Sequence, residues 1–72
     1  MLTFADATDL DTLRLRGEFV AMPGLVINSA QVARLLGVRI QRATLILEAL
    51  EREAFLVRMA GGSYRRRYPL PV

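Results

Sequence analysis

Apolar residues in the first third of the chain recur at the spacing of a helix that buries one face. Leu15, Phe19 and Met22 lie at positions i, i+4 and i+7, and Leu13 and Val20 lie beside them. This pattern predicts a helix that ends at about Met22 and packs these side chains into a core.

Residues typical of turns mark both ends of this predicted helix. Thr8 and Asp11 have the spacing of a capping box, and Asp9 is an alternative N-cap. Pro23 and Gly24 form a turn signal that ends the helix.

Two further helical patterns follow, and Gly37 separates them. Ser29 is predicted to cap the first of the two, because its hydroxyl can accept from the free N–H groups of the first turn. Val32, Leu35 and Leu36 line that helix. The next helix is predicted to reach about Glu53, and its apolar stripe consists of Ala43, Ile46, Leu47 and Leu50.

Gly37 predicts a sharp corner between these two helices. Glycine adopts the left-handed backbone conformation of a helix C-terminus at little steric cost. Ala33 is small enough to let the second helix cross close to it, and Val38 can fill the corner. This arrangement is typical of a helix-turn-helix unit.

Three short stretches predict β-strands. Leu25–Asn28 is an apolar run after a turn, and residues 54–59 alternate, with Phe55, Val57 and Met59 on one face and Leu56 and Arg58 on the other. A glycine-rich turn at 60–63 leads to a returning strand at 64–68, which Pro69 and Pro71 end. We therefore predict a mainly α fold with a small β-hairpin (α+β), organised as an arm at 1–7, one domain at 8–68 and a tail at 69–72.

The composition argues against most classes of enzyme. The 72 residues include no Cys and no His, which removes the commonest general base and the commonest metal ligands. The "AGGSY" turn lacks the Lys and the following helix of a P-loop. We expect no enzymatic activity, no cofactor and no metal site.

Targeting signals are also missing from the sequence. No stretch approaches the roughly 20 apolar residues of a membrane span, and no basic segment precedes an apolar block at the N-terminus. We expect a cytoplasmic protein that does not bind a membrane.

Positive charge is concentrated after the first predicted helix. The net charge is +3, with a balance of −2 over residues 1–18 and +5 over residues 19–72. All ten basic residues are Arg. An all-Arg inventory can reflect a GC-rich genome, but the planar guanidinium also suits phosphates and guanine edges.

The stretch "LRGEFVAMPGL…AQVARLLGV…ILEALEREAFLVRMAGGSYRR" resembles small bacterial winged helix-turn-helix proteins, over about residues 13–67. The resemblance implies the order helix, strand, helix, recognition helix, strand, wing, strand, which matches the order predicted from the residues. It also implies binding to double-stranded DNA, in transcriptional regulation or as a phage or mobile-element accessory, by a homodimer.

In such proteins the recognition helix enters the major groove and the hairpin contacts the backbone or minor groove. The groove-facing residues would be Arg39, Gln41, Arg42 and Thr44. Ser29 and its helix start could hold a phosphate. The wing would contribute Arg58, Arg65, Arg66 and Arg67.

An alternative role is a winged-helix module that binds another protein or a second copy of the chain. Leu45 occupies an outward position where a DNA reader usually carries a polar residue, and Ile40 lies at the edge of the core. Glu48 also faces outward and would repel phosphate. On this hypothesis Leu45 and Ile40, together with Leu2 and Phe4 of the arm, form a protein interface.

Overall fold

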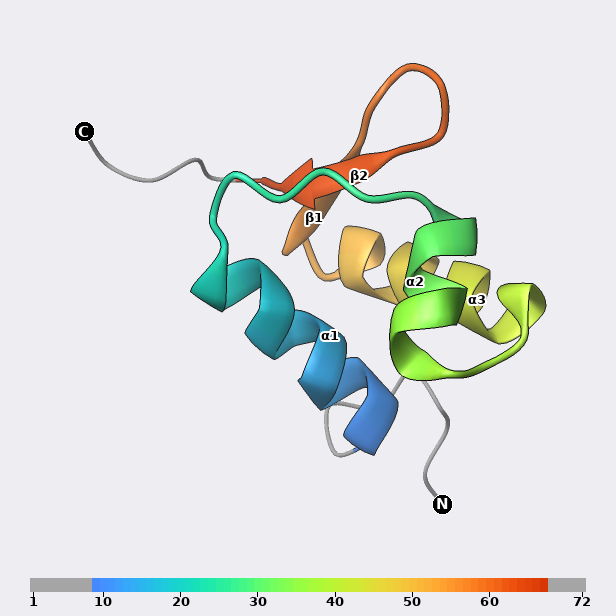
Figure 1. Ribbon diagram of the computed structural model, residues 1–72. Helices are drawn as coiled ribbons and strands as arrows, with labels where there is room; N and C mark the ends of the chain where they lie inside the picture. Colours follow the sequence, from blue (N-terminus) through green and yellow to red (C-terminus); the bar gives the residue numbers. More distant parts are fainter. Residues whose placement is uncertain (1–8, 68–72) are drawn as a thin grey trace.

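Three helices and one two-stranded antiparallel hairpin make up the protein in the computed structural model, which describes residues 9–67 (Figure 1). The predicted α+β class is thereby confirmed. The elements are α1 (Leu10–Ala21), α2 (Ser29–Leu36), α3 (Ile40–Arg52), β1 (Leu56–Arg58) and β2 (Tyr64–Arg66). The predicted arm with Leu2 and Phe4, the cap candidate Thr8, Tyr68 and the tail at 69–72 lie outside the described residues.

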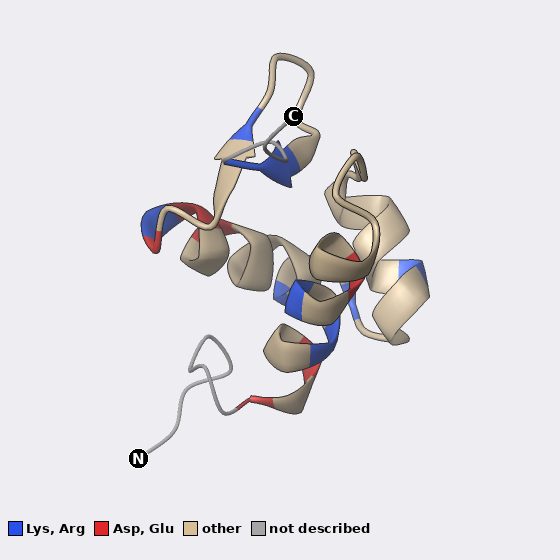
Figure 2. Cartoon of the chain, turned by 90° about the vertical axis from the view of Figure 1, so that its left-hand side faces the viewer, with Lys and Arg blue, Asp and Glu red and all other residues tan. Residues whose placement is uncertain are grey.

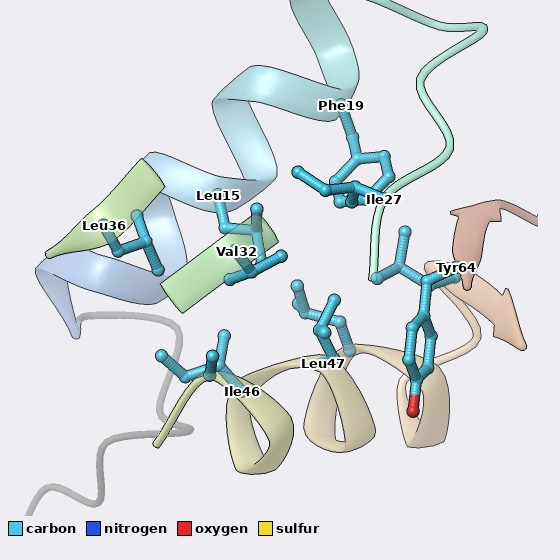
Figure 3. Packing of buried hydrophobic residues seen from close by; sticks show 11 residues of the cluster. Leu15, Phe19, Ile27, Val32, Leu36, Ile46, Leu47 and Tyr64 are labelled. Atoms are coloured by element: carbon cyan, nitrogen blue, oxygen red, sulfur yellow. The ribbon is translucent and has the colours of Figure 1, made fainter. Parts of the chain in front are cut away.

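The core lies between α1 and α3, with α2 closing one side (Figure 3). Leu15 and Phe19 of α1 point toward Ile46 and Leu47 of α3, and Val32 of α2 lies among them. All five side chains are fully buried. The remaining members of this cluster are Ile27, Leu36, Ala43, Leu50, Leu56 and Tyr64.

Helix α1 forms where the sequence predicts it but buries a narrower face. Leu13, Val20 and Met22, which were expected in the core, are 45%, 58% and 47% exposed. Thr12 is fully buried instead, and its hydroxyl donates to the carboxylate of Asp9 at 2.9 Å. The core side of the helix therefore consists of Thr12, Leu15 and Phe19, and the prediction for the other three residues is wrong.

The predicted strand at 25–28 is reduced to a single bridge. The N–H of Ile27 donates to the carbonyl of Tyr64 at 3.1 Å, and the N–H of Tyr64 donates back at 2.9 Å. Val26 is exposed, so only Ile27 of this run enters the core cluster. The bridge fastens the α1–α2 connection to β2.

The hairpin pairs Leu56 with Arg66 and Arg58 with Tyr64. These four residues share one face of the hairpin, and Leu56 and Tyr64 are buried on it. Its turn contains two glycines with φ of 92° and 89°.

No helix in the described part of the chain is long and apolar enough to cross a membrane.

Candidate nucleic-acid interface

The corner between α2 and α3 is built as the sequence predicts. Gly37 has φ 70° and ψ 36°, in the left-handed region, and its N–H donates to the carbonyl of Ala33. The N–H of Val38 donates to the same carbonyl at 3.0 Å. A Cβ on Gly37 would meet no atom within 4 Å, so the glycine is required by backbone conformation and not by space. The chain therefore turns within residues 37–39, and α3 starts directly after them.

The start of α2 differs from the prediction by one residue. Asn28, not Ser29, is the N-cap: its side chain accepts from the N–H of Gln31, and the Gln31 side chain accepts from the N–H of Asn28, both at 2.9 Å. Ser29 is the first helical residue. The backbone N–H groups of Asn28 and Gln31 therefore donate to each other's side chains. Of the first four N–H groups of the helix, this leaves those of Ser29 and Ala30 available.

The first turn of α3 presents a mixed polar and apolar surface. Arg39, the N-cap residue, and Gln41 are exposed. Ile40 and Leu45 are also exposed, at 48% and 43%. The Thr44 hydroxyl donates to the carbonyl of Ile40 at 2.9 Å, so this side chain is turned toward its own helix.

Arg42 lies in a different environment from its neighbours in the helix. Its Nη2 lies 2.9 Å from a carboxylate oxygen of Asp9, and its Nε lies 3.0 Å from one of Asp11. The Asp9 and Asp11 side chains are only 15% and 26% exposed. The guanidinium that was predicted to face the groove therefore joins α3 to the beginning of α1, and its charge is matched within the chain.

Arg58 is also matched within the chain. Its Nη2 lies 3.2 Å from Glu51 and 3.8 Å from Glu48, and its guanidinium lies 5.5 Å from the centre of the Tyr64 ring. The nearby Tyr64 phenol and Glu51 carboxylate raise the pKa of Arg58. Burial raises the pKa of Tyr64 in turn, against the opposing effect of Arg58. Glu48, which was predicted to face outward and repel phosphate, therefore lies beside Arg58.

The three consecutive arginines at the end of the hairpin have different roles. Arg66 lies on the core-facing side, with its guanidinium 4.5 Å from the centre of the Phe55 ring. Its Nε is buried without a hydrogen-bond partner among the described residues. Arg65 lies on the opposite face of β2 and donates to the carbonyl of Arg66 at 2.8 Å. The backbone N–H of Arg67 donates to the carbonyl of Phe55 at 3.0 Å, which extends the pairing by one bond.

Five of the six acidic residues in residues 9–67 form ion pairs with three arginines, Arg16, Arg42 and Arg58. Asp9, Asp11, Glu48 and Glu51 pair as described, and Glu53 pairs with Arg16. Figure 2 shows the acidic segments beside basic ones at the beginning of α1 and the end of α3, whereas the hairpin strands carry basic segments alone. The arginines without an ion pair in residues 9–67 include Arg14, Arg34, Arg39, Arg52, Arg65 and Arg66.

Two features of this surface were missed by reasoning from the sequence. The Asn28–Gln31 cap has a readable signal, since a capping residue followed three positions later by Gln is the spacing of a capping box. The stacking of Arg16 on Phe55, at 4.7 Å, has none, because α1 is distant in sequence from the hairpin that brings Arg66 to 4.5 Å from the same ring.

Comparisons with protein-family models, with curated protein sequences and with solved structures found no match for this chain.

Proposed function

We propose that this chain is a winged helix-turn-helix domain that binds double-stranded DNA, with α3 in the major groove and the β1–β2 hairpin as a wing on the backbone. Its cellular role would be transcriptional control or an accessory function of a phage or mobile element. The observation that carries the proposal is the left-handed corner at Gly37, which leads into a helix whose first turn exposes Arg39 and Gln41. Arg and Gln can make paired hydrogen bonds to guanine and adenine.

The order of the elements supports the same proposal. A short pairing at Ile27 precedes α2, and the hairpin follows α3, as in the winged variant of the motif. The Ile27–Tyr64 bridge fixes the hairpin to the body, so that a wing would have a defined position.

The ion pairs within the chain reduce the number of arginines that we propose as DNA contacts. Arg39 on the groove side and Arg65 on the wing make no ion pair within residues 9–67, so contact with phosphate would break no existing pair. The N–H groups at the start of α2 could hold a further phosphate. Arg42 and Arg58 are engaged by carboxylates, and we assign them a structural role.

A gel-shift titration against random duplex DNA at several salt concentrations tests the proposal. If four to six phosphates are neutralised, the logarithm of the binding constant should fall with the logarithm of salt at a slope of roughly −4 to −5. Arg39→Ala and Arg65→Ala should each weaken binding and reduce the slope by about one. Arg52→Ala, at the opposite end of α3, is the matched control and should change little.

Sequence readout is tested by selecting bound duplexes from a random pool. Gln41→Ala should broaden the selected sequences more than it lowers the non-specific affinity. Binding that does not depend on salt, or equal effects of the Arg39 and Arg52 substitutions, would contradict the proposal.

The exposed apolar residues Ile40 and Leu45 favour one rival function, a surface of α3 that binds protein. On that alternative, Leu45→Asp abolishes capture of a protein partner and leaves any DNA affinity unchanged. On the DNA proposal, the same substitution places a negative charge near the groove and weakens DNA binding.

A further inference from the structure

Helix α1 carries a second apolar stripe on the side opposite the core. Leu10, Leu13, Gly17 and Val20 lie at i, i+3, i+7 and i+10, which is the heptad spacing of helices that pack side by side. The three large side chains are 77%, 45% and 58% exposed. The helix therefore has one stripe that stabilises its own domain and another that faces outward.

Gly17 lies in the middle of the outer stripe and is exposed. A glycine inside a helix costs about 1 kcal/mol relative to alanine. A Cβ at Gly17 would meet nothing within 4 Å, so no neighbour in the same chain requires its absence. The missing side chain does leave a shallow place where the backbone of another helix can approach closely.

The charged residues beside this stripe indicate what the other helix is. Arg14 and Glu18 lie one turn apart on the same flank of the stripe, and neither forms an ion pair with any of residues 9–67. When two copies of a helix pack antiparallel about a two-fold axis, the same flank of each copy faces the other. Arg14 of each copy then lies opposite Glu18 of the other. In a parallel pair the flank with Arg14 and Glu18 would instead face the other flank of the partner helix, where Arg16 already pairs with Glu53.

We propose that the outer face of α1, formed by Leu10, Leu13, Gly17 and Val20, binds the same face of a second copy of this chain in an antiparallel pair. The stripe is self-complementary in shape and charge, as a two-fold interface requires. Leu15 and Phe19 turn the other side of α1 toward α3 (Figure 3), so pairing through the exposed stripe leaves the first turn of α3 accessible. The proposal does not depend on DNA binding, and its tests use no DNA.

Sedimentation velocity over a wide range of protein concentration tests the interface. The natural chain should shift from monomer to dimer as the concentration rises, whereas Leu13→Glu and Val20→Glu should stay monomeric. Val26→Glu is the matched control, because Val26 is 47% exposed but lies outside α1. Circular dichroism and urea unfolding at low concentration should show that all the variants remain folded.

A natural chain that is monomeric at every concentration would overturn the proposal, and residues 1–8 of the same chain would then be the next candidate to cover the stripe. Equal dimerisation of the Leu13→Glu and Val26→Glu variants would overturn it as well, since the interface would have to lie elsewhere.

The antiparallel orientation has its own test. Arg14→Glu or Glu18→Arg alone should weaken the dimer about fivefold, and the double variant should restore it. Because the chain has no cysteine, Arg14→Cys and Glu18→Cys variants can also be mixed and oxidised. A disulfide mainly between the two different variants supports the antiparallel pair. Disulfides mainly between identical copies would overturn it.

Discussion

Gly37 carries the strictest backbone requirement at the corner between α2 and α3. It has φ 70°, and its N–H satisfies a carbonyl at the end of α2. Residues with a side chain reach this conformation only at a cost of about 1–2 kcal/mol. Because a Cβ at Gly37 would meet no atom within 4 Å, no steric clash with a neighbour adds to this cost.

We expect Gly37→Ala to lower the free energy of unfolding by about 1 kcal/mol. Gly24→Ala is the control, because Gly24 also has open space but does not have a positive φ. That control should be neutral or slightly stabilising. Urea unfolding of the two variants beside the natural chain measures both effects, and a Gly24 variant as unstable as the Gly37 variant would refute the conformational explanation.

Tyr64 joins the bridge, the hairpin and the core, and it makes stability sensitive to alkaline pH. Burial raises its pKa above the ordinary value of about 10, so the folded state favours the neutral phenol. The unfolded chain loses this proton first. The free energy of unfolding should therefore fall as pH rises from about 10 through the higher pKa of the folded state.

The composition makes this alkaline effect measurable. Since the chain has neither Lys nor Cys, Tyr64 and Tyr68 are its only side chains that titrate between about pH 8 and 12. Tyr64→Phe should flatten the dependence of urea-unfolding stability on pH in this range. A Phe variant with the same slope as the natural chain would assign the effect to another group.

At the scale of elements, one arginine connects the two helices that enclose the core. Arg42 on α3 contacts both Asp9 and Asp11 at the beginning of α1, where the carboxylates are largely buried. Removing the arginine leaves two neighbouring negative charges with reduced access to water.

Arg42→Met should therefore lower the free energy of unfolding by about 1–2 kcal/mol. Arg39→Met is the matched control, since Arg39 is exposed and makes no ion pair in residues 9–67, and it should change stability little. Thermal or urea unfolding separates the two. If both variants are equally stable, the Asp9–Arg42–Asp11 contacts contribute nothing measurable.

The helices and their order could be predicted because their signals are local. Apolar spacing located α2 and α3 to within about a residue, and Gly37 located the corner between them. Spacing did not show which side of α1 is buried, because that helix has apolar residues on two faces. The strand expected at 25–28 does not form, because only Ile27 of this run pairs with the hairpin, at Tyr64.

The candidate site was harder to predict than the fold. In the sequence, Arg42, Arg58 and Arg66 all look like cations available to DNA. In the folded chain Arg42 and Arg58 form ion pairs with carboxylates, and Arg66 stacks on Phe55. The contacts of Arg42 join segments 31 and 33 residues apart, and those of Arg58 and Arg66 depend on how the hairpin folds back beside the end of α3. Apolar spacing encodes neither.

At the scale of the whole molecule, internal pairing separates the charges into two groups. Five of the six acidic residues in residues 9–67 form ion pairs with only three arginines, so these paired groups together carry a charge of −2. Other arginines, such as Arg39 and Arg65, lie outside these groups. A polyanion would therefore be attracted to the surface around arginines such as Arg39 and Arg65 more than the net charge of +3 spread evenly would suggest, and less to the groups around Arg42 and Arg58. Because guanidinium groups stay protonated, this attraction should not change across the physiological pH range.

The two hydrogen bonds between Ile27 and Tyr64 also affect how the molecule opens. The segment that they fasten is distant in sequence from the hairpin, so breaking the bridge frees the amides of Ile27 and Tyr64 in one step, while β2 keeps its pairing with β1. A fluctuation that frays the end of the chain would expose the amides of both segments to exchange with solvent together. Protection of the amides of Ile27 and Tyr64 is therefore coupled, although more than thirty residues separate them.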